Sequence, residues 1–166
     1  MRTDVTSMEP EKIQRNIKLR AASRLDVKLL HDLLHEPGSE WLDYESAQEM
    51  FEYYSRDAEL ARIYIITADG SAAGMLTVNS EDRELHNVID VDHILVREPM
   101  RGNGIGRAAL TELVKLLELS PDVRLRTQIK PGNTRSVNCF TSVGFKKRFE
   151  KVNGLRQMYY IYPAAP

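Results

Sequence analysis

The segment RGNGIGR, residues 101–107, lies between an apolar run at 88–96 and a helical pattern at about 103–119. Glycines before a helix let the backbone turn sharply and expose N–H groups, and the first helical turn adds unpaired donors and the positive end of the helix dipole. Such a turn binds anions, most often phosphate. Arg101 and Arg107 add charge-assisted contacts, which favour a pyrophosphate over a lone carboxylate. The segment therefore predicts a diphosphate site at the start of a helix.

The patterns on either side of this segment predict an α/β fold with a mixed sheet and flanking helices. Period-two and apolar runs predict strands, and apolar spacings of three and four predict helices. Tight turns are expected at Asp69-Gly70 and Asn153-Gly154, which are strong hairpin signals. The expected order is β-α-α-β-β-β-α-β-α-β-β, with strands at 17–21, 62–67, 72–79, 88–96, 123–129, from 144 onward and 155–162, and helices at 23–36, 43–57, 103–119 and 133–142.

Length and composition limit the classes of protein. The chain has 166 residues, 42% of them apolar, which predicts one globular domain at 17–166 after a polar tail at 1–16. A net charge of −1 gives no case for nucleic acid or an anionic membrane as the main partner. Cys139 is the single cysteine, so no intrachain disulfide is possible, and no apolar leader is evident. We expect a cytoplasmic protein.

Charge is distributed unevenly along the chain. Residues 36–59 carry eight acids against Arg56, whereas residues 97–151 carry twelve Lys or Arg against five acids. Solvated helix faces are a common cause of such runs, and ligands of opposite charge at the two ends are the other. In the second case a cationic ligand would bind near the acidic run and an anionic ligand near the glycine segment.

A dinucleotide site is one alternative for the glycine segment. Residues 104–109 fit the pattern G-x-G-x-x-A between a strand and a helix, as in nicotinamide-binding domains. In those domains, however, the turn follows its strand almost directly and belongs to the first β-α-β unit. Here seven residues separate Val96 from Gly104, and a hairpin and two helices come earlier. These differences disfavour an oxidoreductase.

Two spaced motifs are more specific. The pattern Val96-x-x-Pro99-x-Arg101-Gly102-x-Gly104-Ile105-Gly106 resembles the acetyl-CoA pyrophosphate loop of the GNAT N-acetyltransferase superfamily, whose core is R/Q-x-x-G-x-G/A. Downstream, Asn133-x-x-Ser136-x-x-x-Phe140-x-x-x-Gly144-Phe145 is similar to the family segment N-x-x-A-x-x-x-Y-x-x-x-G-F. Together with the element order, the resemblance covers residues 17–162.

The resemblance implies that the strands at 88–96 and 123–129 splay apart and that acetyl-CoA, as co-substrate, lies in the gap. Backbone groups of the first strand would pair with the pantetheine amides like an added strand. Asn133 would touch the pantetheine arm, and a homodimer through the last strands is a family habit. The implied coenzyme-binding residues are Ile94, Leu95, Val96, Arg101, Gly102, Asn103, Gly104, Ile105, Gly106, Arg107, Asn133 and Phe140.

Transfer of an acetyl group to an amine requires removal of a proton, because an alkylamine has a pKa near 10.4. The strand at 88–96 offers Asp90, Asp92 and His93. Strand alternation would put Asp90 and Asp92 on one face with Ile94, and His93 on the other. We expect Asp92 to be the base, directly or through water, with Asp90 second; ordinary hydrogen-bonded strand residues are the alternative. No metal site is expected.

The chain departs from the family pattern at Phe140, where the family often has a Tyr that protonates the leaving thiolate. Phe140 cannot donate a proton. A thiol pKa near 8.5 makes thiolate a tolerable leaving group at neutral pH, so turnover need not be lost. The expected function is transfer of acetyl from acetyl-CoA to a primary amine of a cationic small molecule or peptide. The alternative is an inactive acyl-CoA-binding sensor.

Overall fold

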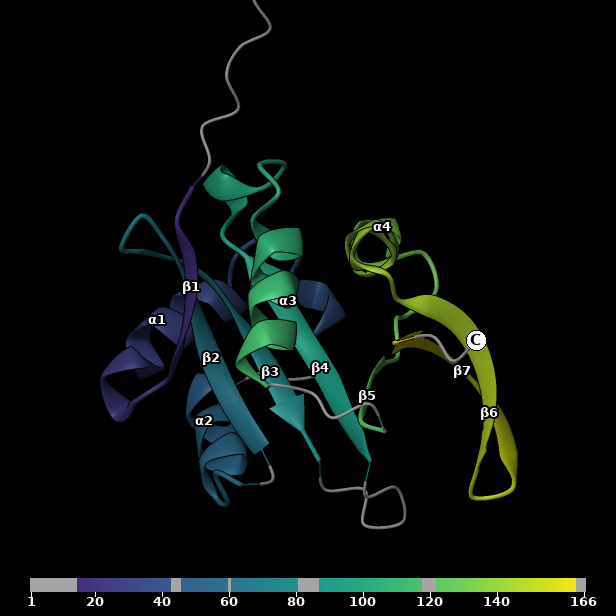
Figure 1. Cartoon of the computed structure of the whole chain (residues 1–166). Coiled ribbons are helices and arrows are strands. Elements are labelled where there is room, and N and C mark those ends of the chain that lie inside the picture. Colours follow the sequence, from purple (N-terminus) through teal and green to yellow (C-terminus); the bar gives the residue numbers. More distant parts are fainter. Residues whose placement is uncertain (1–14, 43–45, 60, 81–86, 118–121, 164–166) are drawn as a thin grey trace, which may run out of the picture.

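The computed structural model describes residues 15–42, 46–59, 61–80, 87–117 and 122–163. These residues form one seven-stranded mixed sheet with four α-helices (Figure 1). The polar tail expected at 1–16 lies almost entirely outside the described residues. Among the described helices, none has the length and hydropathy needed to span a bilayer.

The sheet has the order β1-β2-β3-β4-β5-β7-β6, and only the pair β4 and β5 is parallel. Both predicted hairpins are confirmed: Asp69 (φ 52°) with Gly70 (φ 83°), and Asn153 (φ 50°) with Gly154 (φ 77°), adopt the left-handed conformations that two-residue turns require. The strands are β1 (Ile17–Ala21), β2 (Ala61–Ala68), β3 (Ser71–Asn79), β4 (Val88–Val96), β5 (Arg124–Thr127), β6 (Lys146–Val152) and β7 (Leu155–Tyr162).

The helices occur in the predicted order. They are α1 (Val27–Leu34), α2 (Ala47–Ser55), α3 (Ile105–Leu116) and α4 (Thr134–Val143), with short 3-10 turns at η1 (Arg24–Asp26), η2 (Ser39–Trp41) and η3 (Glu98–Met100). The start predicted for the second helix was too early, because Ser46 is the N-cap and its Oγ accepts from the N–H of Glu49. The proposed cap, Asp43, lies outside the described residues.

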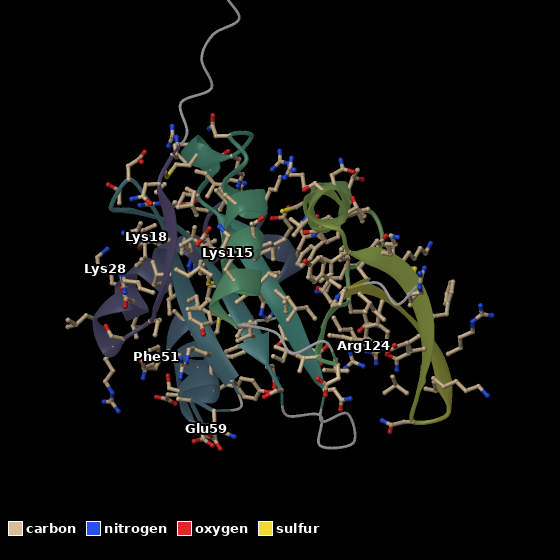
Figure 2. All side chains as sticks on the ribbon, in the orientation of Figure 1. Lys18, Lys28, Phe51, Glu59, Lys115 and Arg124 are labelled. Atoms are coloured by element: carbon tan, nitrogen blue, oxygen red, sulfur yellow. The ribbon has the colours of Figure 1, made fainter. Side chains whose placement is uncertain are left out.

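Two apolar clusters lie on opposite faces of the sheet. Alternating residues of β3 divide between them: Met75 packs with Leu33 of α1 and Met50 of α2, and Leu76 packs in the cluster that contains Leu110 of α3. Figure 1 shows α3 across one face, with the β6–β7 hairpin curving away from it. Charged side chains such as those labelled in Figure 2 at positions 18, 28 and 59 are exposed around this core.

The predicted splay of the central strands is confirmed. Residues 88–90 of β4 pair with residues 124–126 of β5, after which pairing stops. Strand β4 continues to Val96, whereas β5 ends at Thr127, two residues earlier than predicted. The open edge of β4 beyond Asp90 therefore faces a gap rather than a neighbouring strand.

A β-bulge in β4 changes which side chains share a face. Thr77 of β3 is opposite His93, but the next residue, Val78, is opposite Val91, so Asp92 is an extra residue. The predicted alternation is therefore interrupted at Asp92, whereas Ile94 and His93 lie on opposite faces as predicted. Ile94 packs in the cluster beneath α3, whereas His93 bonds to Thr77 on the face covered by α1 and α2.

Candidate active site

Two adjoining cavities lie along the splay. The larger, about 1150 Å³, runs from the glycine loop past β4 to the start of α4. The smaller, about 770 Å³, lies between α2, the β4–β5 junction and β7. Asp92 and His93 line both cavities, so they lie where the two spaces meet. A two-substrate reaction needs such a junction, because each substrate can enter from its own side.

The glycine loop has the backbone shape expected of an anion site. Gly102 (φ 77°) and Gly104 (φ 74°) adopt left-handed conformations, and Gly104 is the N-cap of α3. An added Cβ at either glycine would meet nothing within 4 Å, so the turn rather than the available space requires glycine here. The first-turn N–H groups of α3 therefore face an open space lined by Ile105, Gly106 and exposed Arg107.

The Arg101 side chain lines the larger cavity and also contacts its own loop. Its Nε donates to the carbonyl of Val96 at 2.7 Å, and its Nη1 would lie 3.0 Å from a Cβ on Gly38. The side chain thus folds beneath its own loop, and its charge lies 4.0 Å from Glu36. Arg107 remains exposed beside the loop, whereas Arg101 supports the loop from behind.

The three predicted pantetheine partners on β4 are not equivalent. The N–H of Arg97 donates to Ala73 on β3, so by strand alternation the backbone groups of Leu95 also face β3. The backbone groups of Leu95 therefore lie away from the open edge, on which those of Ile94 and Val96 lie. The carbonyl of Val96 accepts from Arg101, which leaves Ile94 as the central backbone position at the gap.

A set of hydrogen-bonded side chains lies where the two cavities meet. The hydroxyl of Tyr54 on α2 donates to Asp92 Oδ2 at 2.7 Å and lies 3.3 Å from His93 Nδ1. The hydroxyl of Thr77, which is fully buried, lies 2.9 Å from the same nitrogen. The bulge lets neighbouring Asp92 and His93 reach the same Tyr54. The structure thus joins a carboxylate, an imidazole and a phenol into one hydrogen-bonded group.

Asp90 has a different environment. Its two carboxylate oxygens accept from Nε and Nη2 of Arg126 at 2.6 and 2.8 Å, a bidentate pair across the β4–β5 junction. The Arg126 side chain is 6% exposed, and its hydrogen bonds to Asp90 raise its pKa. The Arg126 guanidinium also lies 4.5 Å from the ring of Tyr159. The ion pair of Asp90 with Arg126 therefore connects β4 and β5 at the point where the two strands begin to diverge.

The second motif forms the start and core of α4. Asn133 caps the helix, its Oδ1 accepting from the N–H of Ser136 at 3.2 Å, and it lines the larger cavity. Phe140 is buried and packs edge-on against Phe145 with centroids 4.9 Å apart. Burial raises the pKa of Cys139 to about 11, which keeps this thiol protonated at neutral pH.

Sequence reasoning did not identify Thr77 or Glu36 as site residues, and it named Tyr54 only as one of four tyrosines, with Tyr53, Tyr159 and Tyr160, that could replace the missing acid at position 140. Tyr54 was assigned to the apolar face of its helix, and it is indeed buried, but its hydroxyl reaches Asp92. No local signal marked the β-bulge, because the bulge depends on how β4 pairs with β3. A buried Tyr whose helix faces an acidic strand was the one available hint.

Comparison with solved structures places this geometry in a known class. Aminoglycoside acetyltransferase AAC(6′)-Ib in complex with coenzyme A superposes with a TM-score of 0.73 at 23% identity, covering 88% of this chain and 94% of that one. RimL, an α-N-acetyltransferase of a ribosomal protein, gives 0.68 at 21%, covering 88% and 92%. An acetyltransferase from Thermus thermophilus gives 0.69 at 22%, covering 89% and 97%. No curated protein sequence matches this chain significantly.

The fold of this chain is thus the fold of these acetyltransferase structures. The profile of the acetyltransferase (GNAT) family matches residues 27–145, and the chain belongs to this family. The predicted family is therefore confirmed, and with it the enzyme class, an acyltransferase. The dinucleotide alternative is wrong, because the glycine loop follows η3 in a mixed sheet rather than a strand of a doubly wound one.

Proposed function

We propose that this protein transfers the acetyl group of acetyl-CoA to a primary amine by direct attack in a ternary complex. The observation that carries the proposal is the position of Asp92 and His93 where the two cavities meet. The coenzyme would occupy the larger cavity and the amine the smaller one. Both reacting groups would then approach each other beside the open edge of β4.

The residues of the larger cavity fit coenzyme A. The diphosphate would accept from the first-turn N–H groups of α3, with Arg107 adding positive charge. The pantetheine arm would follow the open edge of β4 like an added strand, with Asn133 on the other wall. This would place the thioester carbonyl near the N–H of Ile94, a donor suited to the oxyanion of the tetrahedral intermediate.

The proton of the attacking amine would pass to the group formed by Asp92, His93 and Tyr54, directly or through one water molecule. The neutral amine would then attack the thioester carbon to form a C–N bond. Collapse of the intermediate would break the C–S bond and release the thiolate of coenzyme A, and the nitrogen would lose its extra proton to this thiolate or to water, which leaves the neutral amide. The carboxylate of Asp92 and the imidazole of His93 would both take part in accepting the amine proton. This arrangement suits a base that must work near neutral pH.

Phe140 does not disfavour turnover. Its ring packs in the core against Phe145 and so has a structural role that a family Tyr would also need to fill. Thiolate can leave unprotonated near neutral pH because a thiol pKa is near 8.5. The packing role of Phe140 is therefore compatible with an active enzyme, and thiol release distinguishes the enzyme from the catalytically inactive sensor.

The smaller cavity favours a cationic acceptor. Asp92 lines it together with the rings of Tyr53, Tyr54 and Tyr159. The lining also includes Lys130 and the ion pair of Asp90 with Arg126, so the proposal depends chiefly on Asp92 and the Tyr rings. Carboxylates attract an ammonium group, and Tyr faces stabilise cations in a partly desolvated site. Two of the solved structures described above are named for acetylating an aminoglycoside and a ribosomal protein. We propose an amine of an aminoglycoside, a polyamine or a basic peptide terminus.

A thiol-release assay tests the proposal. Acetyl-CoA is mixed with the protein and a panel containing kanamycin, spermidine and N-terminal peptides, and free coenzyme A is measured with a thiol reagent. We expect release that depends on one class of amine. Tight coenzyme A binding without release on any amine would instead support the sensor.

Variants at the cavity junction assign the base. Asp92→Asn and His93→Gln should each lower kcat by about 10²-fold or more if both belong to the base group. The loss for Asp92→Asn should be greatest at low pH, where fewer amines are neutral. An unchanged pH–rate profile in both variants would remove the assignment while leaving acetyl transfer itself intact.

A further inference from the structure

One connecting segment forms part of both walls of the larger cavity. Residues 36–42, called here the linking segment, join α1 to α2, and several of them line the cavity. The ring of Trp41 reaches the opposite wall, since a Cβ on Gly132 would lie 3.8 Å from Trp41 Cη2. The segment therefore crosses the space through which a pantetheine arm would run.

The side chain of Glu36 connects the linking segment to the residues just before the glycine loop. Glu36 Oε2 accepts from the backbone N–H of Glu98 at 2.7 Å, and Glu36 Oε1 accepts from Arg97 Nε at 3.2 Å. Arg101 Nη2 lies 4.0 Å from the same carboxylate. With a side chain only 17% exposed, Glu36 meets these donors in a partly desolvated environment, where charge-assisted hydrogen bonds are strong.

Contacts with Val96 and Gly38 determine the orientation of the Arg101 side chain. Its guanidinium is enclosed between Val96, whose carbonyl accepts from Nε, and Gly38, whose missing Cβ leaves room for Nη1. Gly38 has a φ of 93°, so a residue with a side chain would be disfavoured by conformation as well as by space. Glu36 and Gly38 of the linking segment thus contact Arg97, Glu98 and Arg101, which lie before and at the start of the glycine loop.

We propose that Glu36 is a positioning residue that couples occupation of the diphosphate loop to the placement of Trp41 across the cavity. This proposal rests on the proposed function, since it assumes that coenzyme A binds at the loop. Glu36 touches neither substrate. It holds η3 and Arg101 so that the first-turn N–H groups of α3 stay exposed, and it moves with Trp41 because both belong to one short segment. Coenzyme binding thereby prepares the wall that faces the acceptor.

The chain offers a direct reporter of this coupling. Trp41 is its single tryptophan, so tryptophan fluorescence reports on the linking segment alone. Adenosine diphosphate is a suitable probe because it carries the diphosphate but has no pantetheine arm to contact Trp41. The comparison uses the full chain, Glu36→Gln, which keeps the shape and removes the charge, and the control Asp32→Asn. Asp32 lies on α1, where its carboxylate pairs with exposed Lys28, away from the glycine loop.

We expect adenosine diphosphate to change Trp41 fluorescence in the full chain and in Asp32→Asn. In Glu36→Gln the change should disappear even at saturation, and calorimetry should show coenzyme A binding about 10-fold more weakly. Equal affinities within twofold, or an unchanged fluorescence response in Glu36→Gln, would overturn the proposal. So would a full chain that binds adenosine diphosphate with no fluorescence change.

A second variant tests the same coupling independently, in case Glu36→Gln does not fold. Gly38→Ala leaves Glu36 in place but pushes the linking segment from Arg101, and it should reproduce the lost fluorescence response. A wild-type response in Gly38→Ala would contradict the coupling. The failure of the proposed function is distinguishable, because it would appear as an absence of amine-dependent thiol release by the unchanged protein, whatever the fluorescence response to adenosine diphosphate.

Discussion

Replacement of Gly106 by alanine probes how closely α3 and α4 pack behind the coenzyme cavity. Gly106 lies in the first turn of α3, and an added Cβ would lie 3.0 Å from Cys139 Sγ on α4. Ordinary contacts of this kind are about 3.5–4.0 Å, so the two helices must separate by roughly half an ångström. The other near atoms, on Ile94 and Val96 of β4, would lie at an ordinary 3.8 Å. The strain therefore falls on α4.

Two effects compete in this variant. Alanine gains about 1 kcal/mol over glycine in a helix interior, and less in a first turn. Overpacking costs about 1–3 kcal/mol. We therefore expect Gly106→Ala to lower the free energy of unfolding by about 1 kcal/mol. If Cys139 is the residue that clashes, Gly106→Ala made in the Cys139→Ala background should leave the free energy of unfolding unchanged or raise it.

Urea unfolding of the four proteins in this cycle measures the coupling between the two positions. We expect a coupling energy of about 1–2 kcal/mol, because removing Sγ removes the clash. Additive effects, or a Gly106→Ala variant that is more stable than the parent chain, would refute the close packing of these helices.

Three further predictions follow from single contacts. Gly104→Ala should weaken coenzyme A binding in calorimetry about fivefold, because its φ of 74° costs a side-chain-bearing residue about 1 kcal/mol; an unchanged affinity would contradict the loop geometry. Hydrogen bonds from Arg20 lower the pKa of Asp26 from 3.8 to about 2, so this pair stabilises the fold fully above about pH 4 and is lost as pH falls toward 2. Since Arg20 is half-exposed, the loss should be about 1–2 kcal/mol in urea unfolding, and Asp26→Asn should abolish this pH dependence; a variant that keeps it would exclude the pair as the cause. Asp90→Asn should cost about 2–4 kcal/mol of unfolding free energy, because it removes the bidentate carboxylate from the buried Arg126 charge; a loss below about 1 kcal/mol would contradict this role.

The parts of the fold that were predictable depend on local chemistry. The hairpins at 69–70 and 153–154 follow from residues that tolerate a positive φ, and the cap at Asn133 follows from a side chain that accepts from the helix N–H groups. The glycine loop is likewise predictable, because its turns require glycine at particular positions. These signals are complete within a few residues, so one sequence is enough to identify them.

The parts that were not predictable depend on contacts between distant residues. The extra residue at Asp92 arises from the register of β4 on β3, which shifts between Thr77 and Val78. Glu36 meets the glycine loop 61 and 62 positions further along the chain. No local pattern distinguishes such a glutamate from a solvated one, and the same holds for the direction in which Arg101 turns.

Calorimetry with coenzyme A and with pantetheine tests the central claim most directly, because the two ligands share the arm and pantetheine lacks the diphosphate together with its 3′-phosphoadenosine. If the amides at the start of α3 hold the diphosphate, coenzyme A should bind about 100-fold more tightly, the equivalent of two charge-assisted hydrogen bonds. Equal affinities, or no heat with coenzyme A, would contradict it.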